Sequence, residues 1–387
     1  MVAKMNMRES SIKKRTVQIT ITENCNLNCV YCYEHNKDYG SLTIDAVKKI
    51  IEYHFAEERF EEIEFDFHGG EPALAFDILK PVCEWLWSES RPKKYICFAS
   101  TNGTLIHGEI QEWFRQNASR FWLGLSLDGT REMQNINRSN SYDMIDFAFF
   151  RDMWPTQDVK MTISPLSLPT LFDGIKHIHE LGFKLSANLA HGISWPKNLV
   201  PIYRDQLKKI ADFYLNNPQY EPCRVVRFNI RKIGSNAIYP ELKQEHLKWC
   251  GTGDQMICYA ANGKVYPCQM FMPSCMSPDG DKIALKLDFT NQSNFVDPQC
   301  AACCLDGGCS TCYGMNYNET GNVYTRPKDM CDFLKCEAVA TSYLYGKMLM
   351  DANRYPIVKE LSDAERLAYI KGIEIVQETL ADEVMNF

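Results

Sequence analysis

Three closely spaced cysteines, Cys25, Cys29 and Cys32, are the residues of this chain whose spacing most directly indicates chemistry. The spacing is C-x3-C-x2-C, and three such thiolates can hold three irons of a four-iron cluster while the fourth iron stays open. A structural zinc site normally takes four protein ligands, and no fourth Cys or His follows in register, His35 being the nearest. Because an open iron can bind a further ligand, the spacing predicts a reactive iron–sulfur centre. The alternative is a loop of buried or zinc-binding cysteines.

This motif resembles that of the radical S-adenosylmethionine (SAM) enzymes. The resemblance implies that the open iron binds the amino and carboxylate groups of SAM, and that an electron from the cluster cleaves SAM to a 5′-deoxyadenosyl radical. It also places Tyr31 against the adenine. The segment Gly69-Gly70-Glu71-Pro72 matches the family's GGEP element, in which the glycines would let the backbone approach a ligand and Glu71 would bind the methionine amine.

Four further candidates follow the third and fourth predicted strands: Asn102, Ser126, Asp128 and Arg138. The resemblance places these residues near the ribose and carboxylate of SAM, and the guanidinium of Arg138 suits a carboxylate. Each of them could equally be a turn or surface residue. The predicted SAM-binding set is Tyr31, Gly69, Gly70, Glu71, Pro72, Asn102, Ser126, Asp128 and Arg138.

Strand alternation over 62–68 places Ile63, Phe65 and Phe67 on one face and Glu64, Asp66 and His68 on the other. The polar face is expected to point into the interior of a barrel. We predict His68 and Asp66 as catalytic candidates, with a simple polar lining as the alternative.

Short apolar strands alternate with amphipathic helices from about residue 16 to 216, which predicts a parallel sheet with helices outside. Thr43 is expected to cap a helix with Ile44, Val47, Ile51 and Phe55 on one face. The six units match the α/β partial (β/α)6 TIM-like barrel of the radical SAM family, although periodicity alone also permits a doubly wound sheet. Strands are predicted at 16–22, 62–68, 95–99, 121–127, 159–164 and 184–189, with later helices at 74–87, 108–117, 142–153, 169–181 and 199–216.

Parallel βα folds place their sites at the carboxyl ends of the strands. The cysteine loop, the GGEP segment and the loops 100–104, 126–129, 164–167 and 191–195 each follow one predicted strand. All six loops are therefore expected to converge on one mouth.

Cysteine density rises sharply between Cys250 and Cys336, where regular periodicity fades. This part resembles a SPASM domain, the auxiliary-cluster module found on many peptide-modifying radical SAM enzymes. The module's pattern would fill two four-iron clusters completely, so that these centres would transfer electrons and not bind SAM. A pair of structural zinc sites is the alternative. The pattern assigns Cys250, Cys258, Cys268 and Cys312 to one cluster and Cys300, Cys303, Cys309 and Cys331 to the other.

Other cysteines leave this assignment open. Cys275, Cys304 and Cys336 could substitute for a ligand, and the final spacing is two residues where the module often has three. We expect Cys83 and Cys97 to be core residues, and Cys223 has no assigned role.

Composition narrows the class of protein. The 387 residues carry a net charge of −7, which gives no general basic footprint for nucleic acid. No apolar run approaches a membrane span, and 1–15 has no signal-peptide core. A cytoplasmic location is therefore expected, and seventeen cysteines in a cytosolic chain favour metal ligation over disulfides. We predict a barrel at 16–220, an auxiliary-cluster domain at 221–340 and a helical segment at 341–387.

The substrate class follows from the resemblance. The module is usual in enzymes that act on ribosomal peptides and proteins, and the segment 309–317 looks like that of maturases that form thioether or related cross-links in cysteine-rich precursor peptides. Anaerobic sulfatase maturases are the alternative, but they carry an acidic base where this chain has Gln269, and an amide cannot take a proton as a carboxylate does. A non-catalytic iron–sulfur carrier or a zinc-binding protein is the alternative from another class.

The expected cofactors are one [4Fe–4S] cluster bound by three cysteines and SAM, two auxiliary [4Fe–4S] clusters, and SAM itself. The expected partners are a precursor peptide and an electron donor such as flavodoxin or ferredoxin, with no nucleic acid and no membrane. Because 1–15 is too short for a winged-helix leader-binding domain, leader recognition would fall to the module, the C-terminal helices or a separate leader-binding protein.

Overall fold

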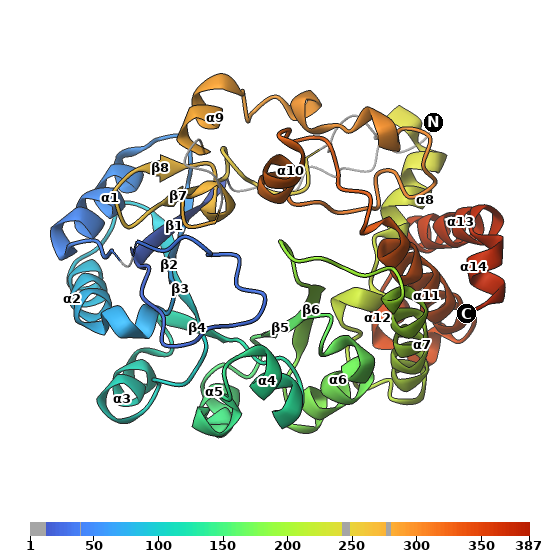
Figure 1. Ribbon diagram of the computed structural model, residues 1–387, viewed down its shortest axis with the longest axis horizontal. Helices are drawn as coiled ribbons and strands as arrows, with labels where there is room; N and C mark the ends of the chain where they lie inside the picture. Colours follow the sequence, from blue (N-terminus) through green and yellow to red (C-terminus); the bar gives the residue numbers. More distant parts are fainter. Residues whose placement is uncertain (1–12, 39, 242–247, 276–279) are drawn as a thin grey trace.

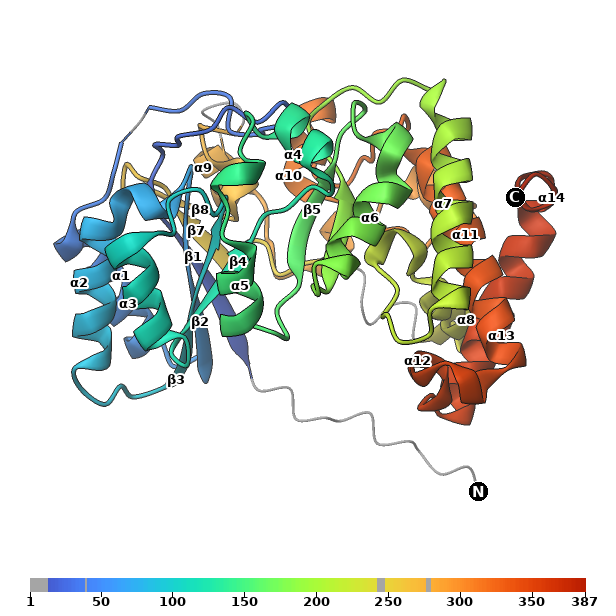
Figure 2. The same cartoon turned by 90° about the horizontal axis from the view of Figure 1, so that it is seen from below.

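The computed structural model describes residues 13–387 apart from 39, 242–247 and 276–279. Most of the segment 1–15, in which we expected no leader-binding domain, lies outside the described residues. Figure 1 shows the elements arranged as a ring, with the strands toward its inner side and α1–α7 outside them. Seen from the side, the barrel strands run roughly parallel to one another, and the C-terminal helices lie beside α7 (Figure 2).

Six parallel strands confirm the predicted α/β partial barrel. The strands β1 (Lys14–Thr22), β2 (Glu62–Gly69), β3 (Lys94–Thr101) and β4 (Phe121–Leu125) pair in parallel in the order β4-β3-β2-β1. β5 (Val159–Ile163) and β6 (Leu185–Leu189) form a second parallel pair. A bridge between Ser126 and Lys160, with the Leu127 N–H donating to the Lys160 carbonyl over 2.9 Å, joins β4 to β5.

The helices cover the outer face of the sheet because that face is apolar. Ile63, Phe65 and Phe67 of β2 are buried there, as alternation predicted. Thr43 caps α1, its hydroxyl accepting a hydrogen bond from the Ala46 N–H. The helices are α1 (Ile44–Ala56), α2 (Phe76–Trp87), α3 (Gly108–Asn117), α4 (Arg131–Asn137), α5 (Phe147–Met153), α6 (Leu171–Glu180) and α7 (Leu199–Asn216).

The predicted continuous helix over 142–153 is wrong. A 3-10 turn covers Tyr142–Met144, and α5 begins only at Phe147. The chain restarts its helix there because the Asp146 carboxylate accepts a hydrogen bond from the Phe149 N–H. Before it lies α4, which we did not predict and which ends where Ser139 and Asn140 adopt positive φ values of 52° and 57°.

A strand from the cysteine-rich region extends the barrel sheet. β7 (Met256–Tyr259) pairs in parallel with β1, and β8 (Val265–Tyr266) pairs antiparallel with β7. Behind them a second apolar core forms around Phe271, Phe289 and Phe295, which is consistent with a separate unit in this region. Helices α9 (Gly280–Lys286) and α10 (Tyr313–Thr320) contribute to this core, whereas α8 (Ile230–Ile238) places Ile230 and Ile233 in the main core.

The chain ends in helices that pack back on the barrel. α11 (Cys331–Met350) contacts α7 and continues through the predicted domain boundary at 340, so the domain limits remain predictions. α13 (Asp363–Thr379) packs closely against α8, and α12 (Pro356–Lys359) and α14 (Ala381–Met385) are short. Within the described residues, every helix is too short or too polar to cross a membrane.

Candidate active site and iron–sulfur centres

The cysteine loop after β1 is held against the GGEP segment by backbone contacts. The Gly70 N–H donates to the Thr22 carbonyl over 3.1 Å, and the Glu71 N–H donates to the Asn24 carbonyl over 2.8 Å. A Cβ on Gly69 would lie 2.2 Å from the Thr22 oxygen, and one on Gly70 would lie 2.4 Å from the Asn24 oxygen. The glycines therefore admit the cysteine loop itself, and their predicted role of letting the backbone approach a ligand stays a prediction.

Glu71 joins the ends of β2 and β3. Its buried carboxylate accepts hydrogen bonds from the Thr101 hydroxyl at 2.7 Å, the Asn102 N–H at 2.8 Å and the Ala73 N–H at 3.1 Å. Burial raises the pKa of Glu71, while these hydrogen bonds act in the opposite direction. In the structure the carboxylate serves the protein's own backbone, and its contact with a SAM amine remains a prediction. Pro72 then opens a 3-10 turn, Pro72–Ala75, that leads into α2.

A second set of hydrogen bonds ties the cysteine loop to the loop after β3. The Asn26 amide donates to the Thr104 hydroxyl over 2.8 Å, and the Asn102 amide donates to the Asn26 side-chain oxygen over 2.9 Å. Asn102 is thus placed beside the cysteines, as its predicted role requires. On the far side, the Asn28 N–H donates to the Ser139 hydroxyl and the Val30 N–H donates to the Asn137 carbonyl. The irregular turn after α4 therefore anchors the cysteine loop.

Tyr31, Asp128 and Arg138 form one buried group next to Cys29. The Tyr31 hydroxyl donates to Asp128, and Arg138 Nε lies 3.0 Å from the same carboxylate. The Arg138 guanidinium also lies over the Tyr31 ring, 5.3 Å from its centre. Asp128 is fully buried and further accepts hydrogen bonds from the Asn137 amide and the Thr162 N–H. Nearby negative charge, Asp128 first, raises the pKa of Arg138 despite its burial, so the guanidinium stays charged.

The thiols of Cys25, Cys29 and Cys32 are half-buried and unpaired by disulfides. Burial raises the pKa of Cys29 to about 11, so a free thiol there is protonated at neutral pH and must lose its proton to bind iron. The Cys32 N–H donates to the Cys29 carbonyl, which curls the loop. Among the described residues, no group of three or more Cys, His, Asp or Glu side chains is arranged to bind a single metal ion. Three thiols of one loop, fixed on three sides by the barrel, fit the ligand set of a four-iron cluster.

His68 and Asp66 reach the barrel interior, as predicted, but have different neighbours. His68 Nε2 lies 3.7 Å from Glu34 Oε1, which also belongs to the cysteine loop region, and neither atom has a hydrogen bond. Asp66 Oδ2 accepts a hydrogen bond of 3.3 Å from the Gln18 amide, while Oδ1 is buried without a partner. Burial raises the pKa of Asp66. Ser126 is half-buried at the junction of β4 and β5, and its side chain is given no role by the structure.

Gln269, which stands where a sulfatase maturase has its acidic base, lies next to β1. Its N–H donates to the Gln18 side-chain oxygen over 3.3 Å, so Gln18 connects Gln269 with Asp66. Sequence reasoning missed Gln18 and Glu34. Alternation within β1 could have found Gln18, but nothing local indicates that Glu34 meets His68, since 34 residues separate them in the chain.

The first predicted auxiliary set is gathered around Cys268. The Trp249 N–H, next to Cys250, donates to the Tyr313 hydroxyl, next to Cys312. The Gly253 N–H donates to the carbonyl of Pro267, which precedes Cys268. Burial raises the pKa of Cys268 to about 12, and the adjoining Cys312 and Cys250 thiols act in the same direction.

Cys258 faces the barrel. Its sulfur lies 3.7 Å from the Thr20 hydroxyl and 3.5 Å from the Met272 sulfur, both buried. Cys275 is also a neighbour of Cys258 and Cys268, as the charges that act on its pKa show. Cys268 therefore has the thiols of Cys250 and Cys312 as neighbours, and also those of Cys258 and Cys275.

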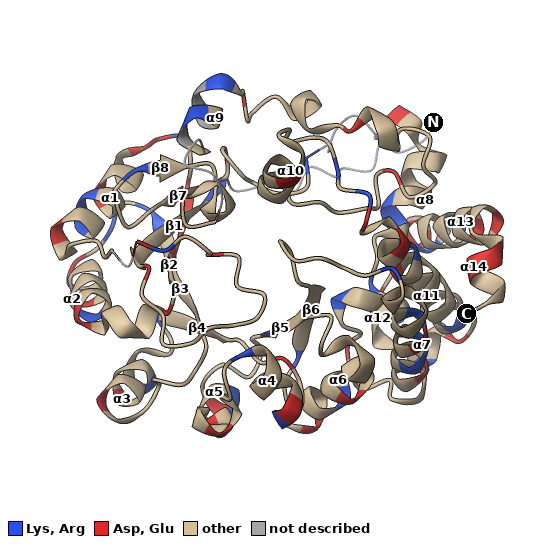
Figure 3. Ribbon diagram, viewed as in Figure 1, with Lys and Arg blue, Asp and Glu red and all other residues tan. Residues whose placement is uncertain are grey.

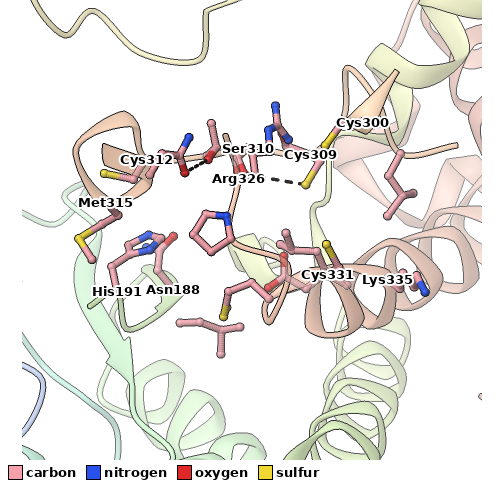
Figure 4. A pocket seen from close by; sticks show the side chains of 18 of the residues that line it. Asn188, His191, Cys300, Cys309, Ser310, Cys312, Met315, Arg326, Cys331 and Lys335 are labelled. Atoms are coloured by element: carbon pink, nitrogen blue, oxygen red, sulfur yellow. Dashed lines mark hydrogen bonds between the residues drawn. The ribbon is translucent and has the colours of Figure 1, made fainter. Parts of the chain in front are cut away.

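The second predicted auxiliary set lines one cavity of about 160 Å³ at the end of β6 (Figure 4). Cys300, Cys303, Cys309 and Cys331 all border it, and Cys312 lies at its rim. The Arg326 guanidinium donates to the Cys309 carbonyl over 2.6 Å and holds that loop. The structure thus brings the four residues together.

The remaining cysteines differ in their distance from these sets. Cys304 packs on the main core beside Cys303 of the second set, whereas Cys336 borders a different cavity with Arg204. Cys83 and Cys97 are core residues, as predicted, and Cys223 is buried there too.

Many of the charged residues are carried by the helices on the outside of the ring (Figure 3). Four charged residues described above differ, because each is buried: Asp66, Glu71, Asp128 and Arg138. Buried charges of this kind are normally paired or functional.

Comparison with known proteins agrees with this geometry. A family model described as the radical SAM superfamily matches residues 19–192. A cysteine-type anaerobic sulfatase-maturating enzyme of Clostridium perfringens is 31% identical over 134 residues, which are 32% of this chain and 35% of that protein. An uncharacterized protein of Methanocaldococcus jannaschii is 31% identical over 121 residues, which are 31% of this chain and 40% of that protein. The sequence matches thus span well under half of these curated relatives.

Solved structures share the fold over most of the chain. The structure of native anSMEcpe with bound AdoMet has a TM-score of 0.63 and 20% identity, covering 87% of this chain and 99% of that one. Streptococcus suis SuiB bound to S-adenosylmethionine has a TM-score of 0.53 and 17% identity, covering 82% and 77%. Both proteins have also been solved with peptides, the Cp18Cys peptide and the precursor peptide SuiA respectively. With its cysteine loop, its partial barrel and the match over 19–192, this chain is a radical SAM enzyme that has the fold of anSMEcpe and SuiB.

Proposed function

We propose that this radical SAM enzyme is a peptide maturase that installs a thioether or related cross-link in a cysteine-rich, ribosomally made precursor peptide. The observation that carries the proposal is the joint placement of the Cys25–Cys32 loop, the Tyr31–Asp128–Arg138 group and two further cysteine sets around one barrel. The fold shared with SuiB and anSMEcpe, both solved with peptides, supports a peptide substrate.

The residues at the mouth have separate tasks in this proposal. Cys25, Cys29 and Cys32 would hold a [4Fe–4S] cluster, and the chemistry that it would supply together with SAM is a 5′-deoxyadenosyl radical. Arg138, whose charge is fixed by Asp128, offers its remaining N–H groups to the SAM carboxylate. Tyr31 presents its ring near the adenine, and the backbone of Gly69 and Gly70 holds the cysteine loop in place.

The substrate side lies deeper in the barrel. His68 and Asp66 are the proposed acid–base candidates, because each has an unpartnered buried atom facing the interior. Forming a carbon–sulfur bond removes one hydrogen from carbon and one proton from the thiol, and leaves one electron. Electron acceptance is the chemistry that the two auxiliary [4Fe–4S] clusters of a SPASM domain would supply, and the residues that would hold them are Cys250, Cys258, Cys268 and Cys312 for one and Cys300, Cys303, Cys309 and Cys331 for the other.

Formylglycine formation on a sulfatase is the second candidate, favoured by the match to the Clostridium perfringens enzyme. The amide of Gln269 counts against it, because it cannot accept a proton as a carboxylate does.

The proposal also includes two partners and a location. The partners are an electron donor such as flavodoxin or ferredoxin and a separate leader-binding protein. The location is cytoplasmic, since iron–sulfur ligands need a reducing compartment.

The test is the mass of a cysteine-rich peptide encoded beside this gene after anaerobic co-expression. Loss of two hydrogens per modification together with loss of a free thiol is the expected result. Loss of two hydrogens with all thiols intact would indicate a carbon–carbon or carbon–oxygen link. An unchanged peptide, combined with conversion of a sulfatase cysteine to formylglycine, would replace the proposal with the second candidate.

A further inference from the structure

The barrel contains a cavity that the proposed SAM site does not use. It has a volume of about 550 Å³, within the roughly 300–1,000 Å³ usual for ligand sites. Its lining comes from the first halves of the strands, with Thr16, Glu64 and Ile96 in one layer and Gln18, Asp66 and Phe98 in the next. It therefore lies toward the amino ends of the strands, whereas the cysteine loop lies at their carboxyl ends.

Two opposite charges face this cavity without forming an ion pair. Lys160 of β5 donates a hydrogen bond of 2.6 Å to the Ser100 hydroxyl and lies over the Phe98 ring, 4.9 Å from its centre. Asp66 of β2 lies close enough for each charge to act on the pKa of the other, yet none of the ion pairs found among the described residues joins them. Glu64, the other acid here, is already paired with Lys14 at 2.8 Å.

Both charges have unused hydrogen-bonding capacity. Asp66 is 9% exposed and its Oδ1 has no partner, although a buried carboxylate oxygen normally has one. Lys160 has three N–H donors, of which Ser100 takes one. Lys160 is exposed, so water solvates its ammonium when no ligand is bound, whereas burial raises the pKa of Asp66. Asp66 Oδ1 thus lacks a hydrogen-bond partner, and two donors of Lys160 face solvent in the same cavity, where a ligand can take the place of water.

A peptide unit has the complementary arrangement, because its N–H and C=O point in opposite directions. A carboxylate ligand would be attracted by Lys160 but repelled by Asp66, and an amine would meet the reverse. A neutral amide satisfies both walls and needs no net charge. Three residues of β2, at roughly 3.3 Å each, separate Asp66 from Gly69, so a chain held here has about 10 Å to reach the cysteine loop, passing His68.

We propose that Asp66 and Lys160 are the two poles of a site that orients one peptide unit of the substrate, Asp66 Oδ1 accepting its N–H and Lys160 Nζ donating to its C=O. The inference rests on the proposed function only in taking the substrate to be a peptide. Lys160 is then a positioning residue, and it sets which way the substrate chain runs through the barrel.

The test uses the neutral capped tripeptide acetyl-Ala-Cys-Ala-amide as the probe, with acetate and methylammonium as the charged alternatives. Trp122 lines the cavity and is 38% exposed, so its fluorescence reports binding, and Trp122→Phe protein supplies the background from the other tryptophans. We expect a saturable change with the tripeptide. Lys160→Met and Asp66→Asn should each weaken it about tenfold, the effect of one charge-assisted hydrogen bond.

Two further variants separate positioning from folding. Lys160→Arg keeps the donor and should restore most of the affinity, whereas Lys184→Met, which removes an exposed lysine paired with Glu221, should leave it unchanged. Saturable binding of acetate alone, or of methylammonium alone, would overturn the two-pole site, as would tripeptide binding that is insensitive to both Lys160→Met and Asp66→Asn.

The same proteins distinguish this inference from the proposed function. If the wild type modifies the co-expressed peptide while both variants bind the tripeptide normally, the two-pole site is wrong and the maturase proposal stands. If tripeptide binding depends on both poles but no peptide or protein is modified, the maturase proposal is wrong and the site stands.

Discussion

Replacing Gly70 with alanine should separate the cysteine loop from the barrel. The new Cβ would lie 2.4 Å from the Asn24 oxygen and 2.7 Å from the Glu23 oxygen, and backbone atoms cannot rotate away as a side chain can. The two segments must move apart, which breaks the hydrogen bonds from Gly70 to Thr22 and from Glu71 to Asn24.

The magnitude follows from these contacts. Two backbone hydrogen bonds contribute about 1 kcal/mol each, and forcing a methyl group into a packed contact costs about 1–3 kcal/mol, so Gly70→Ala should lower the free energy of unfolding by about 3–5 kcal/mol. Gly346 is the matched control, because it lies inside α11 and a Cβ there would have no atom within 4 Å beyond its own helix backbone. Gly346→Ala should raise the free energy of unfolding by up to about 1 kcal/mol, since alanine favours a helix.

The assay is urea unfolding under anaerobic conditions, followed by tryptophan fluorescence, together with iron content after reconstitution. Gly70→Ala should lose stability and the iron bound by the cysteine loop, and Gly346→Ala should lose neither. Wild-type stability and iron content in Gly70→Ala would refute the argument that the glycine exists for the close approach of the two loops.

Three further predictions test other parts of the structure. Arg138→Met leaves Asp128 buried without its counter-charge, so it should cost about 3–5 kcal/mol of unfolding free energy and weaken SAM binding measured by calorimetry; undiminished SAM affinity would contradict the assigned contact. Burial lowers the pKa of His54 and His179 to about 4 from an ordinary 6.5, so the unfolded chain binds more protons between these values and the free energy of unfolding should fall by up to about 3 kcal/mol per histidine as pH drops through this range. His179→Gln should make the free energy of unfolding depend less on pH, as measured by urea unfolding at several pH values. An unaltered pH dependence would contradict the lowered pKa of His179. Gly234→Ala puts a Cβ 1.8 Å from a backbone oxygen of α13 and should loosen the C-terminal helices, seen as faster amide exchange there; native protection would argue against that packing.

The sequence was sufficient for the parts of the fold that depend on local pattern. The alternation in β2 and the Thr43 cap are decided by neighbours within a few residues, and both are present as expected. The helix predicted over 142–153 failed because apolar spacing does not show where a side chain such as Asp146 restarts a helix.

Long-range contacts explain what sequence reasoning missed at the site. The pairing of β7 with β1 joins segments more than 200 residues apart, and only the folded chain shows that it puts Cys258 against Thr20. The close approach of the GGEP glycines to backbone of another loop was missed for the same reason, and their predicted contact with SAM stays a prediction. Lys160 carries no motif, and its proposed role comes from lining the same cavity as Asp66, which only the folded chain shows.

The most direct test of the account is whether the cysteine loop supports SAM cleavage. Wild-type protein, Cys29→Ala and the core variant Cys83→Ala would be reconstituted anaerobically, reduced with dithionite and incubated with SAM, and 5′-deoxyadenosine would be measured by chromatography. We predict 5′-deoxyadenosine from the wild type and from Cys83→Ala, and none from Cys29→Ala. Cleavage that persists in Cys29→Ala would contradict the assignment of this loop.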